Sequence, residues 1–394
     1  MNLIYITDNY VNPLSGGIAR ISYVMAEFLS RQFGYTCYSV YANPTQEIIS
    51  IDSSVFADVY FWQGKNAFCS WIEQIGGGVV IVQSPCVLAK DIFECVSSLP
   101  MIKIVNVFHG IPGFEIVPLR WNIIWYRLIH GIEIRWTLKQ ALLQLAMKVV
   151  PKSYFFDKLR SKYSSSYQSA HKIVVLSKGT IENYQSIAPG RLSDFIAIPN
   201  ACSFDVDKIV IPQDKYLNKE ILVVARLDDW HKRISEILKI WEMIQKDNRF
   251  KEWVLRIVGD GIDASYYKNY VTKKQLRNIV FEGQQKPLSY YLNASIFLVT
   301  SACEGFCLTI LESQQCGCVP IVYDSFSAAS ELVIDGKNGI LVENNNRKLF
   351  ADKLKYLILN EDIRKEMSIQ SIESSNRFSV EKVASLWNDL LQSL

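Results

Sequence analysis

Short apolar runs alternate with longer segments of helical periodicity along this whole chain. Because the apolar runs are rich in β-branched residues and have strand length, they predict buried strands, and the segments between them predict helices. Strands joined through helices form right-handed crossovers and therefore a parallel sheet. In the first half the predicted strands are 3–7, 37–42, 76–84, 101–110, 171–180 and 195–201.

A second series of strands begins at residue 219, after a polar, Pro-containing stretch over 201–219. Its strands are predicted at 219–226, 257–261, 278–285, 295–303, 317–325 and 339–344. A length of 394 residues with 49% hydrophobic content suits two cores better than one. We therefore expect two α/β domains with their boundary near 201–219, followed by a last amphipathic helix over 378–394.

Net charge and targeting signals restrict the partners and the compartment that we expect for this protein. The net charge is only +3, and no domain-wide excess of Lys and Arg accompanies a nucleic-acid-binding motif, so we expect no nucleic acid partner. The chain starts directly with a strand-like segment, lacks the pattern of a signal peptide, and has no run of about 18 uncharged apolar residues. We expect a cytoplasmic protein.

The nine cysteines agree with that compartment. Their number is odd, they form no CxxC pair, and several lie within apolar runs, which predicts reduced, buried thiols. The cluster Cys303, Cys307, Cys316 and Cys318 does not have the spacing of a zinc site, so we expect no metal there.

The segment EGFCLTILE, residues 304–312, is the tightest chemical constraint in the chain. Glu304 falls on a strand-to-helix turn, and Glu312 follows about two helical turns later. The helix N-terminus between them offers free N–H groups to a phosphate or a sugar hydroxyl. Two glutamates at this spacing are also compatible with ordinary exposed helix charges, so the surrounding motifs decide between the two interpretations.

Three further strand ends carry residues suited to a phosphorylated ligand. Arg226 and Lys232 follow one buried strand, Gly259 and Gly261 follow the next, and Gln284 follows a third. In this order the motifs resemble the C-terminal half of a glycosyltransferase of the GT-B fold, of the retaining family 4 or glycosyl transferases group 1 type. The resemblance covers nearly the whole chain.

The resemblance implies a role for each of these residues. Arg226 and Lys232 would stabilise the departing nucleoside diphosphate, Glu304 would stabilise the positive charge at the anomeric carbon, and Glu312 would bind the ribose. The backbone of Phe306, Cys307, Leu308 and Thr309 would contact the sugar, with Gly259, Gly261 and Gln284 bordering the diphosphate and base. Family members often have Gly or Pro where Cys307 stands, which leaves the sugar preference open.

The N-terminal half contributes two candidate positions. Gly16 and Gly17 precede the first helix, where backbone N–H groups can approach a diphosphate, although a glycine pair is also a common turn. His109 ends a buried strand, where ligands of open sheets gather. The resemblance places a His matching His109 beside the donor sugar.

The implied protein is a hexosyltransferase with two Rossmann-like, doubly wound parallel-sheet domains facing across a cleft. Residues 1–204, joined by the helix 378–394, would bind the acceptor, and 205–377 would bind a UDP- or GDP-sugar, with no cofactor required. The expected acceptor is a hydroxyl of a glycan or of a lipid-linked sugar, in polysaccharide or glycoconjugate biosynthesis. A GT-B sugar-nucleotide epimerase and a degenerate glycan-binding relative remain alternatives, whereas a phosphorylase would need a pyridoxal lysine that we cannot identify.

Residues 120–162 combine nine Lys or Arg with only two Asp or Glu and several aromatic side chains. Such a segment can seat a protein peripherally on an anionic membrane face, next to a lipid-linked acceptor. It can equally form packed helices with inward aromatics and solvated cations.

A DxD pattern at Asp205 and Asp207 falls in the predicted linker, and we do not expect it to bind a metal.

Overall fold

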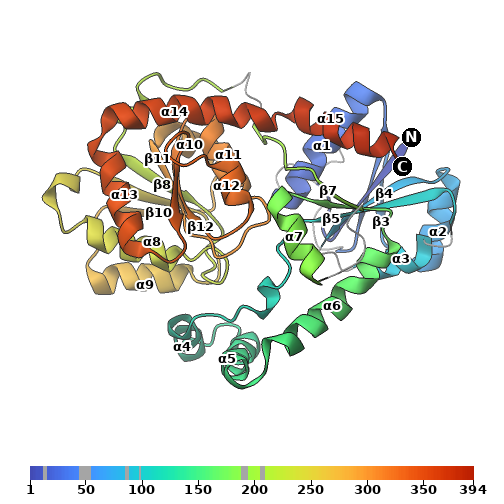
Figure 1. The fold of residues 1–394 in the computed structure, drawn as a ribbon, viewed down its shortest axis with the longest axis horizontal. Coiled ribbons are helices and arrows are strands. Elements are labelled where there is room, and N and C mark those ends of the chain that lie inside the picture. Colours follow the sequence, from blue (N-terminus) through green and yellow to red (C-terminus); the bar gives the residue numbers. More distant parts are fainter. Residues whose placement is uncertain (12–15, 44–54, 85–87, 97–98, 188–193, 205–208) are drawn as a thin grey trace. The chain divides into compact units, whose positions relative to one another are not determined.

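The computed structural model describes residues 1–11, 16–43, 55–84, 88–96, 99–187, 194–204 and 209–394. The chain divides into two compact units (Figure 1). The first comprises Met1–Pro112, Phe156–Ser203 and Phe378–Leu394, and the second comprises Gly113–Phe155 and Phe204–Arg377. The chain thus passes between the units at 203–204, within the polar stretch expected to connect them.

The first unit is built on a seven-stranded sheet in the order β3-β2-β1-β4-β5-β6-β7, with every neighbouring pair parallel. Its strands are β1 (Asn2–Thr7), β2 (Thr36–Tyr41), β3 (Asp58–Phe61), β4 (Gly78–Ser84), β5 (Ile102–Phe108), β6 (Lys172–Val175) and β7 (Phe195–Ala197). Its helices are α1 (Gly17–Phe33), α2 (Lys65–Gln74), α3 (Ala89–Val96), most of α6 (Lys152–Ser169), α7 (Lys178–Ile187) and α15 (Val380–Gln392).

The second unit is built on a six-stranded parallel sheet in the order β10-β9-β8-β11-β12-β13. Its strands are β8 (Glu220–Val224), β9 (Val254–Val258), β10 (Ile279–Gly283), β11 (Ile296–Val299), β12 (Val319–Asp324) and β13 (Ile340–Glu343). Its helices are α4 (Trp121–Ile129), α5 (Ile134–Val149), α8 (Ile234–Ile244), α9 (Ala264–Lys274), α10 (Leu288–Asn293), α11 (Leu308–Gln315), α12 (Ala328–Leu332), α13 (Arg347–Leu359) and α14 (Glu361–Ser375).

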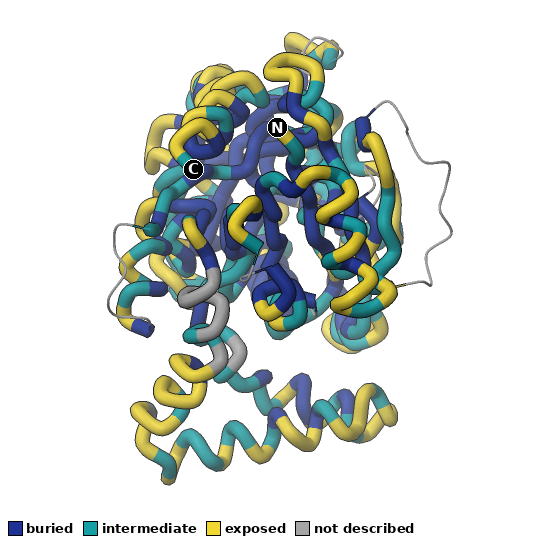
Figure 2. The backbone as a smooth tube through the Cα atoms, turned by 90° about the vertical axis from the view of Figure 1, so that its right-hand side faces the viewer, coloured by how far each residue is buried: buried dark blue, intermediate teal, exposed yellow. Residues whose placement is uncertain are grey.

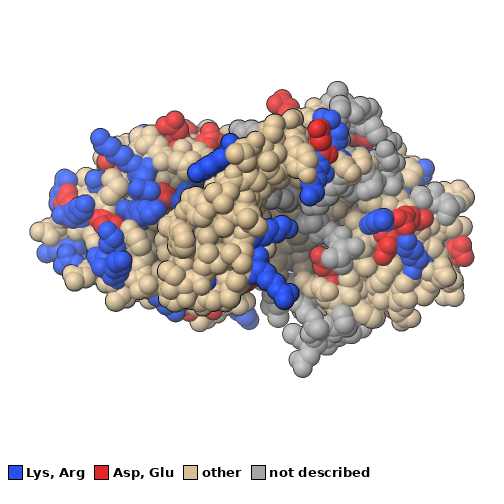
Figure 3. Space-filling view, turned by 90° about the horizontal axis from the view of Figure 1, so that it is seen from below, with Lys and Arg blue, Asp and Glu red and all other residues tan. Residues whose placement is uncertain are grey.

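These two parallel sheets confirm the predicted fold class. Strands with burial on both faces form the centre of each unit, because helices cover both faces of a parallel sheet. Figure 2 shows the dark, buried tube at the centre of the first unit. The strand β3 was not predicted, since its four residues DVYF include an acid and are only partly buried. Lys and Arg are interspersed with Asp and Glu over much of the face seen in Figure 3, as the small net charge implies.

The last helix behaves as predicted. α15 belongs to the first unit although it follows the second along the chain. Tyr35 donates a hydrogen bond from its hydroxyl to the side-chain oxygen of Asn388, at 2.8 Å. Val383, Ala384 and Trp387 are buried, so the apolar face of this helix supplies its attachment.

The segment 113–155 groups with the second unit, whereas the sequence analysis placed it in the N-terminal domain. α4 and α5 form a small core of their own around Leu119, Ile123 and Ile124, to which Trp136 and Trp230 add partly buried rings. Trp230 also donates a hydrogen bond from its indole to the carbonyl of Val117, at 2.6 Å. This attachment through tertiary contacts is invisible to a sequence pattern.

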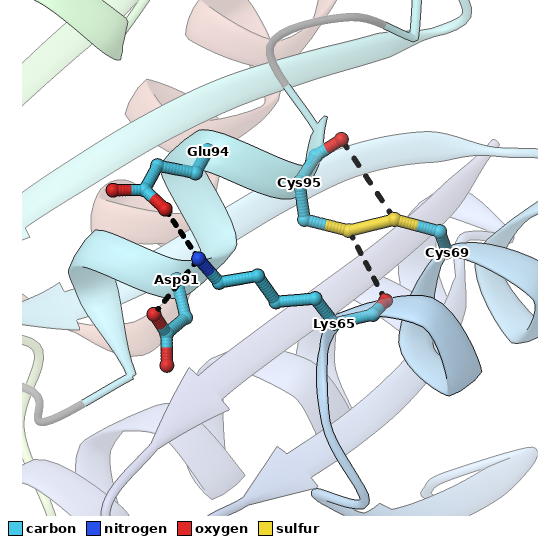
Figure 4. Close-up of a disulfide and its surroundings, with 5 residues drawn as sticks. All are labelled: Lys65, Cys69, Asp91, Glu94 and Cys95. Atoms are coloured by element: carbon cyan, nitrogen blue, oxygen red, sulfur yellow. Dashed lines mark hydrogen bonds and ion pairs between the residues drawn. A yellow bond between two sulfur atoms is a disulfide. The ribbon is translucent and has the colours of Figure 1, made fainter.

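The prediction that the cysteines are reduced is wrong for Cys69 and Cys95, which form a disulfide between α2 and α3 (Figure 4). Their Cα atoms lie 6.5 Å apart because the two helices pack side by side, and the spacing of 26 residues gave no sign of it. On the same pair of helices, Lys65 forms ion pairs with Asp91 and Glu94. The remaining described cysteines are free, and Cys86 lies outside the described residues.

Candidate functional site

The loop between β8 and α8 carries the two predicted cations. Arg226 follows the strand by two residues, and its side chain is 64% exposed. One guanidinium nitrogen lies 3.1 Å from the carboxylate of Asp228, which also accepts a hydrogen bond from His231 at 2.8 Å. Burial alone would raise the pKa of Asp228, but the hydrogen bond from His231 and nearby positive charges lower it below its usual value. Asp228 thus holds Arg226 and His231 together at the end of the strand.

Lys232, on the same loop, forms an ion pair with Glu304, which lies on the loop between β11 and α11. Both side chains are largely buried. Burial lowers the pKa of Lys232, but the negative charge of Glu304 outweighs that effect, so this pKa lies above its usual value. The structure therefore brings together the predicted leaving-group cation and the predicted anomeric acid.

Arg233 fixes the two loops against each other. Its backbone has φ 49°, in the left-handed region that a non-glycine residue rarely adopts. Its buried guanidinium donates hydrogen bonds to the carbonyls of Thr300, at 2.9 Å, and Ser301, at 2.6 Å. The hydroxyl of Thr300 donates back to the carbonyl of Arg233 at 3.0 Å. Because these bonds tie the end of β11 to the start of α8, they also fix the backbone that carries Lys232.

The N-terminus of α11 lies between the two glutamates, as predicted. Cys307 is its N-cap residue, with φ 68°, and Leu308 and Thr309 begin the helix. A position with this backbone conformation favours glycine, so a non-glycine residue here is unusual. Burial, reinforced by the charge of Glu304, raises the pKa of the Cys307 thiol to about 12, so the side chain is a neutral thiol. Phe306, just before it, is buried.

Glu312 is 1% exposed, and its carboxylate accepts a hydrogen bond from the hydroxyl of Tyr291 at 3.0 Å. It is therefore not the exposed helix charge that the spacing of the two glutamates also allowed. Its contact with the ribose stays a prediction.

The glycines at the end of β9 have a structural explanation. A Cβ atom on Gly259 would lie 1.9 Å from the carbonyl oxygen of Ala225, and one on Gly261 would lie 2.6 Å from that of Leu227. Only glycine allows the ends of β8 and β9 to approach so closely. Gln284 is exposed just after β10. A diphosphate contact by these three residues stays a prediction.

The first unit contains the other predicted positions. Gly16 and Gly17 lie at the start of α1, where a Cβ atom on Gly16 would have open space around it. His109 directly follows β5, and its Nε2 lies 2.5 Å from the side-chain oxygen of Gln83. Burial lowers the pKa of His109 to about 4, so its ring is neutral at pH 7. The imidazole is therefore suited to hydrogen bonding rather than to carrying a positive charge.

No group of three or more His, Cys, Asp or Glu side chains comes together to hold a metal ion in the part of the chain that the structure describes. Cys307, Cys316 and Cys318 are buried free thiols. Asp205 and Asp207 of the DxD pattern lie outside the described residues.

Sequence reasoning missed the residues that support the site. Asp228, His231 and Tyr291 each contact a predicted site residue, and Arg233 braces the loop between them. The segment RLDDWHK, residues 226–232, was available as a signal, because acids and a histidine between two cations at a strand end indicate a charge network. Nothing in the sequence connects Tyr291 to Glu312.

Residues 207–374 match the family model of glycosyl transferases group 1. An uncharacterized glycosyltransferase of Haemophilus influenzae is 28% identical over 197 residues, which are 49% of this chain and 55% of that protein. The amylovoran biosynthesis glycosyltransferase AmsD of Erwinia amylovora is 26% identical over 230 residues, 57% of this chain and 63% of that protein. The chain thus spans less than two thirds of the length of either relative.

The fold is similar to that of a solved structure. A mutant of Staphylococcus aureus TarM, crystallised with fondaparinux, α-GlcNAc-glycerol and UDP, superposes with a TM-score of 0.76 over 99% of both chains at 12% identity. At this identity the likeness concerns the fold alone. The chain therefore matches the glycosyl transferases group 1 model over residues 207–374 and has the two-domain GT-B fold.

Proposed function

We propose that this protein is a retaining glycosyltransferase of family 4 that moves a hexose-type sugar from a UDP- or GDP-sugar to a hydroxyl group. The acceptor is a glycan or a lipid-linked sugar in polysaccharide or glycoconjugate biosynthesis. The match to glycosyl transferases group 1 and the transferase relatives support this assignment. No cofactor or metal is required in this proposal.

The ion pair between Lys232 and Glu304 is the observation that carries the proposal. When a glycosidic bond to a nucleoside diphosphate breaks, negative charge grows on the departing phosphate while positive charge grows on the anomeric carbon. These two charges lie about one bond length apart, so a site that stabilises both needs a cation and an anion side by side. A preorganised pair of this kind stabilises the transition state more than the bound substrate.

The other residues extend this site. Arg226, largely exposed beside Lys232 on the same loop, adds a second cation for the diphosphate. The first N–H groups of α11, at Leu308 and Thr309, are free of intrahelical partners and can bind sugar hydroxyls. Glu312 binds the ribose, and Gly259, Gly261 and Gln284 border the diphosphate and base. In the first unit, Gly16 and Gly17 bind the diphosphate, and His109 hydrogen-bonds the donor sugar.

The reaction follows front-face transfer. The acceptor hydroxyl attacks the anomeric carbon on the side from which the diphosphate departs, so the configuration is retained. Its proton passes to an oxygen of the departing diphosphate, and no side chain forms a covalent bond to the sugar. The first unit presents the acceptor, and the protein works in the cytoplasm, with peripheral contact to the membrane where the acceptor is lipid-linked.

Release of nucleoside diphosphate tests the proposal. Purified protein is incubated with UDP- or GDP-hexoses and a panel of glycan and lipid-linked acceptors, and the anomeric configuration of any product is determined by NMR. Acceptor-dependent release with a retained anomeric configuration is expected. Isomerisation of the donor without an acceptor would indicate an epimerase, and an inverted product would contradict the retaining mechanism.

A further inference from the structure

Helix α5 exposes a stripe of aliphatic side chains. Its fully buried side chains are Thr137 and Gln140, and Trp136, Leu143 and Met147 are partly buried, whereas five other aliphatic side chains face solvent. The exposed side chains are Ile134 (49%), Leu138 (48%), Leu142 (67%), Leu145 (51%) and Val149 (82%). An amphipathic helix of a globular domain normally buries the opposite face. A single exposed leucine is ordinary, but five exposed aliphatic side chains on one helix imply a surface that something covers.

Polar contacts hold α5 in this orientation. The hydroxyl of Thr137 donates to the carbonyl of Ile132 at 3.1 Å, and the side-chain oxygen of Gln140 accepts from the backbone N–H of Leu119 at 3.2 Å. Gln144 donates to the carbonyl of Leu119 at 2.9 Å. Turning the leucines inward would break these bonds and leave buried backbone groups unsatisfied, which is costly. The exposed face is therefore a fixed property of the fold.

The five aliphatic residues form one stripe. At about 100° per residue their spacing of 4, 4, 3 and 4 positions places them within an arc of about 80° on the helix surface. Three exposed cations lie beside the stripe: Arg135 and Lys139 fall on one side of it and Lys148 on the other. We call this surface, made of the five aliphatic residues and the three cations, the α5 face.

The charges indicate what covers the α5 face. Between Glu133 and Asp157 the sequence contains four Lys or Arg and no acid. From below, where α4 and α5 face the viewer, Figure 3 shows a band of mostly uncharged surface with Lys and Arg beside it. A second copy paired through this face would bring cations against cations with no acid to neutralise them. An anionic lipid surface satisfies both features, because its headgroups pair with the cations and its acyl boundary accepts the aliphatic stripe.

The helix lies on such a surface rather than across it. No described helix combines the length with the apolar character that crossing a bilayer requires. The aliphatic arc is also narrow, and the rest of α5 is polar or packed against α4. A helix with one apolar stripe and cationic flanks lies in the plane of the membrane interface.

We propose that the α5 face docks this protein on an anionic membrane surface. Trp136 of α5 packs against Trp230, with ring centroids 5.5 Å apart, and Trp230 lies two residues from Lys232 on the β8–α8 loop. Docking thereby holds the candidate site of the second unit near the lipid headgroups. This role of membrane docking rests on the proposed function, because docking would bring the site to a lipid-linked acceptor.

The test is cosedimentation with vesicles of phosphatidylcholine alone or with about a third of phosphatidylglycerol, at low salt. Wild-type protein is expected to bind the anionic vesicles and to dissociate at high salt. A variant with Leu138→Ser, Leu142→Ser and Leu145→Ser should lose more than about tenfold in partitioning. Its matched control carries Leu359→Ser, Ile369→Ser and Leu386→Ser, which are comparably exposed on other helices, and should bind normally.

A variant without the three cations tests the contribution of charge to binding separately from that of the aliphatic stripe. Arg135→Gln, Lys139→Gln and Lys148→Gln together should weaken binding on the order of a hundredfold, at roughly fivefold per cation. The control is Lys246→Gln, Lys251→Gln and Lys273→Gln, which changes net charge equally through exposed lysines elsewhere. Circular dichroism and thermal unfolding establish that each variant is folded. Leu142→Glu serves as a single-substitution alternative if the triple variant unfolds.

The docking proposal would be overturned if the wild-type protein stayed in the supernatant with anionic vesicles, or if the variants and their controls lost equal amounts of vesicle binding. It would also be overturned if vesicle binding were absent and the protein formed a dimer in solution that the leucine variant abolished. UDP-sugar binding is measured on the same variants in the absence of vesicles. Retained donor binding with no vesicle binding means that docking alone has failed. Vesicle binding without donor binding or transfer means that the proposed function has failed.

Discussion

Lys232 and Glu304 are 72 positions apart in the sequence, yet the structure pairs the lysine ammonium with the glutamate carboxylate. The two residues come from the ends of β8 and β11, which are neighbours in the sheet although they are not consecutive strands. In open parallel sheets the loops at such neighbouring carboxyl ends form the usual ligand site. The pair therefore lies at the edge of the sheet where open parallel α/β folds usually bind their ligands.

Replacing Lys232 by Met keeps most of the side-chain length and removes the charge. We expect the rate of sugar transfer to fall about a hundredfold to a thousandfold, because a preorganised charge at the leaving group is lost. Steady-state measurement of nucleoside diphosphate release checks this, with Lys246→Met, an exposed lysine, as the control. The double variant with Glu304→Gln should be little slower than the worse single variant, since the two side chains act as a unit. Full activity in the folded Lys232→Met protein would contradict the proposed role.

Gly259→Ala should destabilise the second unit. The new methyl group would meet the backbone carbonyl of Ala225, which cannot move aside as a flexible side chain could, and φ at this position is 135°. We expect a loss of about 2 kcal/mol or more in the free energy of unfolding. Chemical denaturation measures it. Gly110→Ala, which meets open space and needs no positive φ, should change stability by less than about 0.5 kcal/mol; equal effects of the two substitutions would contradict the explanation.

His109 should make the first unit sensitive to mild acid. Its pKa is about 4 in the folded protein and 6.5 ordinarily, so the unfolded chain binds more protons between these values. Stability contributed by the neutral ring is therefore complete above about pH 6.5 and declines as the pH falls toward 4. As the pH is lowered from about 6.5 to 4, the melting temperature of the wild type should fall more than that of His109→Asn. Exposed His130→Asn serves as the control, and a difference in melting temperature between wild type and His109→Asn that does not vary with pH would exclude a buried neutral imidazole.

The fold was largely predictable because its central strands are buried on both faces and therefore appear as continuous apolar runs. The short edge strand β3 escaped notice because partial burial leaves no such run. The grouping of 113–155 with the second unit depends on contacts such as Trp136 with Trp230, which join positions about a hundred residues apart. Periodicity along the chain does not encode such contacts.

The sequence predicted where Arg226, Glu304 and Cys307 lie, on loops that follow a strand or at the start of a helix, and their roles in a site stay predictions. The supporting contacts of the candidate site were not predictable. Glu312 accepts a hydrogen bond from Tyr291 of another helix, and Arg233 anchors to carbonyl groups, which every residue possesses. The orientation of α5 was hidden for the same reason, since a helical stripe of leucines normally predicts the buried face.

Binding of a nucleoside diphosphate tests the central claim most directly, because it requires no knowledge of the acceptor. Isothermal titration calorimetry with UDP, GDP and ADP is performed on the wild type, on Glu312→Gln, and on Glu366→Gln as an exposed control. We predict that UDP or GDP binds the wild type and the control alike, and that Glu312→Gln binds the same nucleotide at least about tenfold more weakly. A folded wild-type protein that binds none of the three would contradict the account.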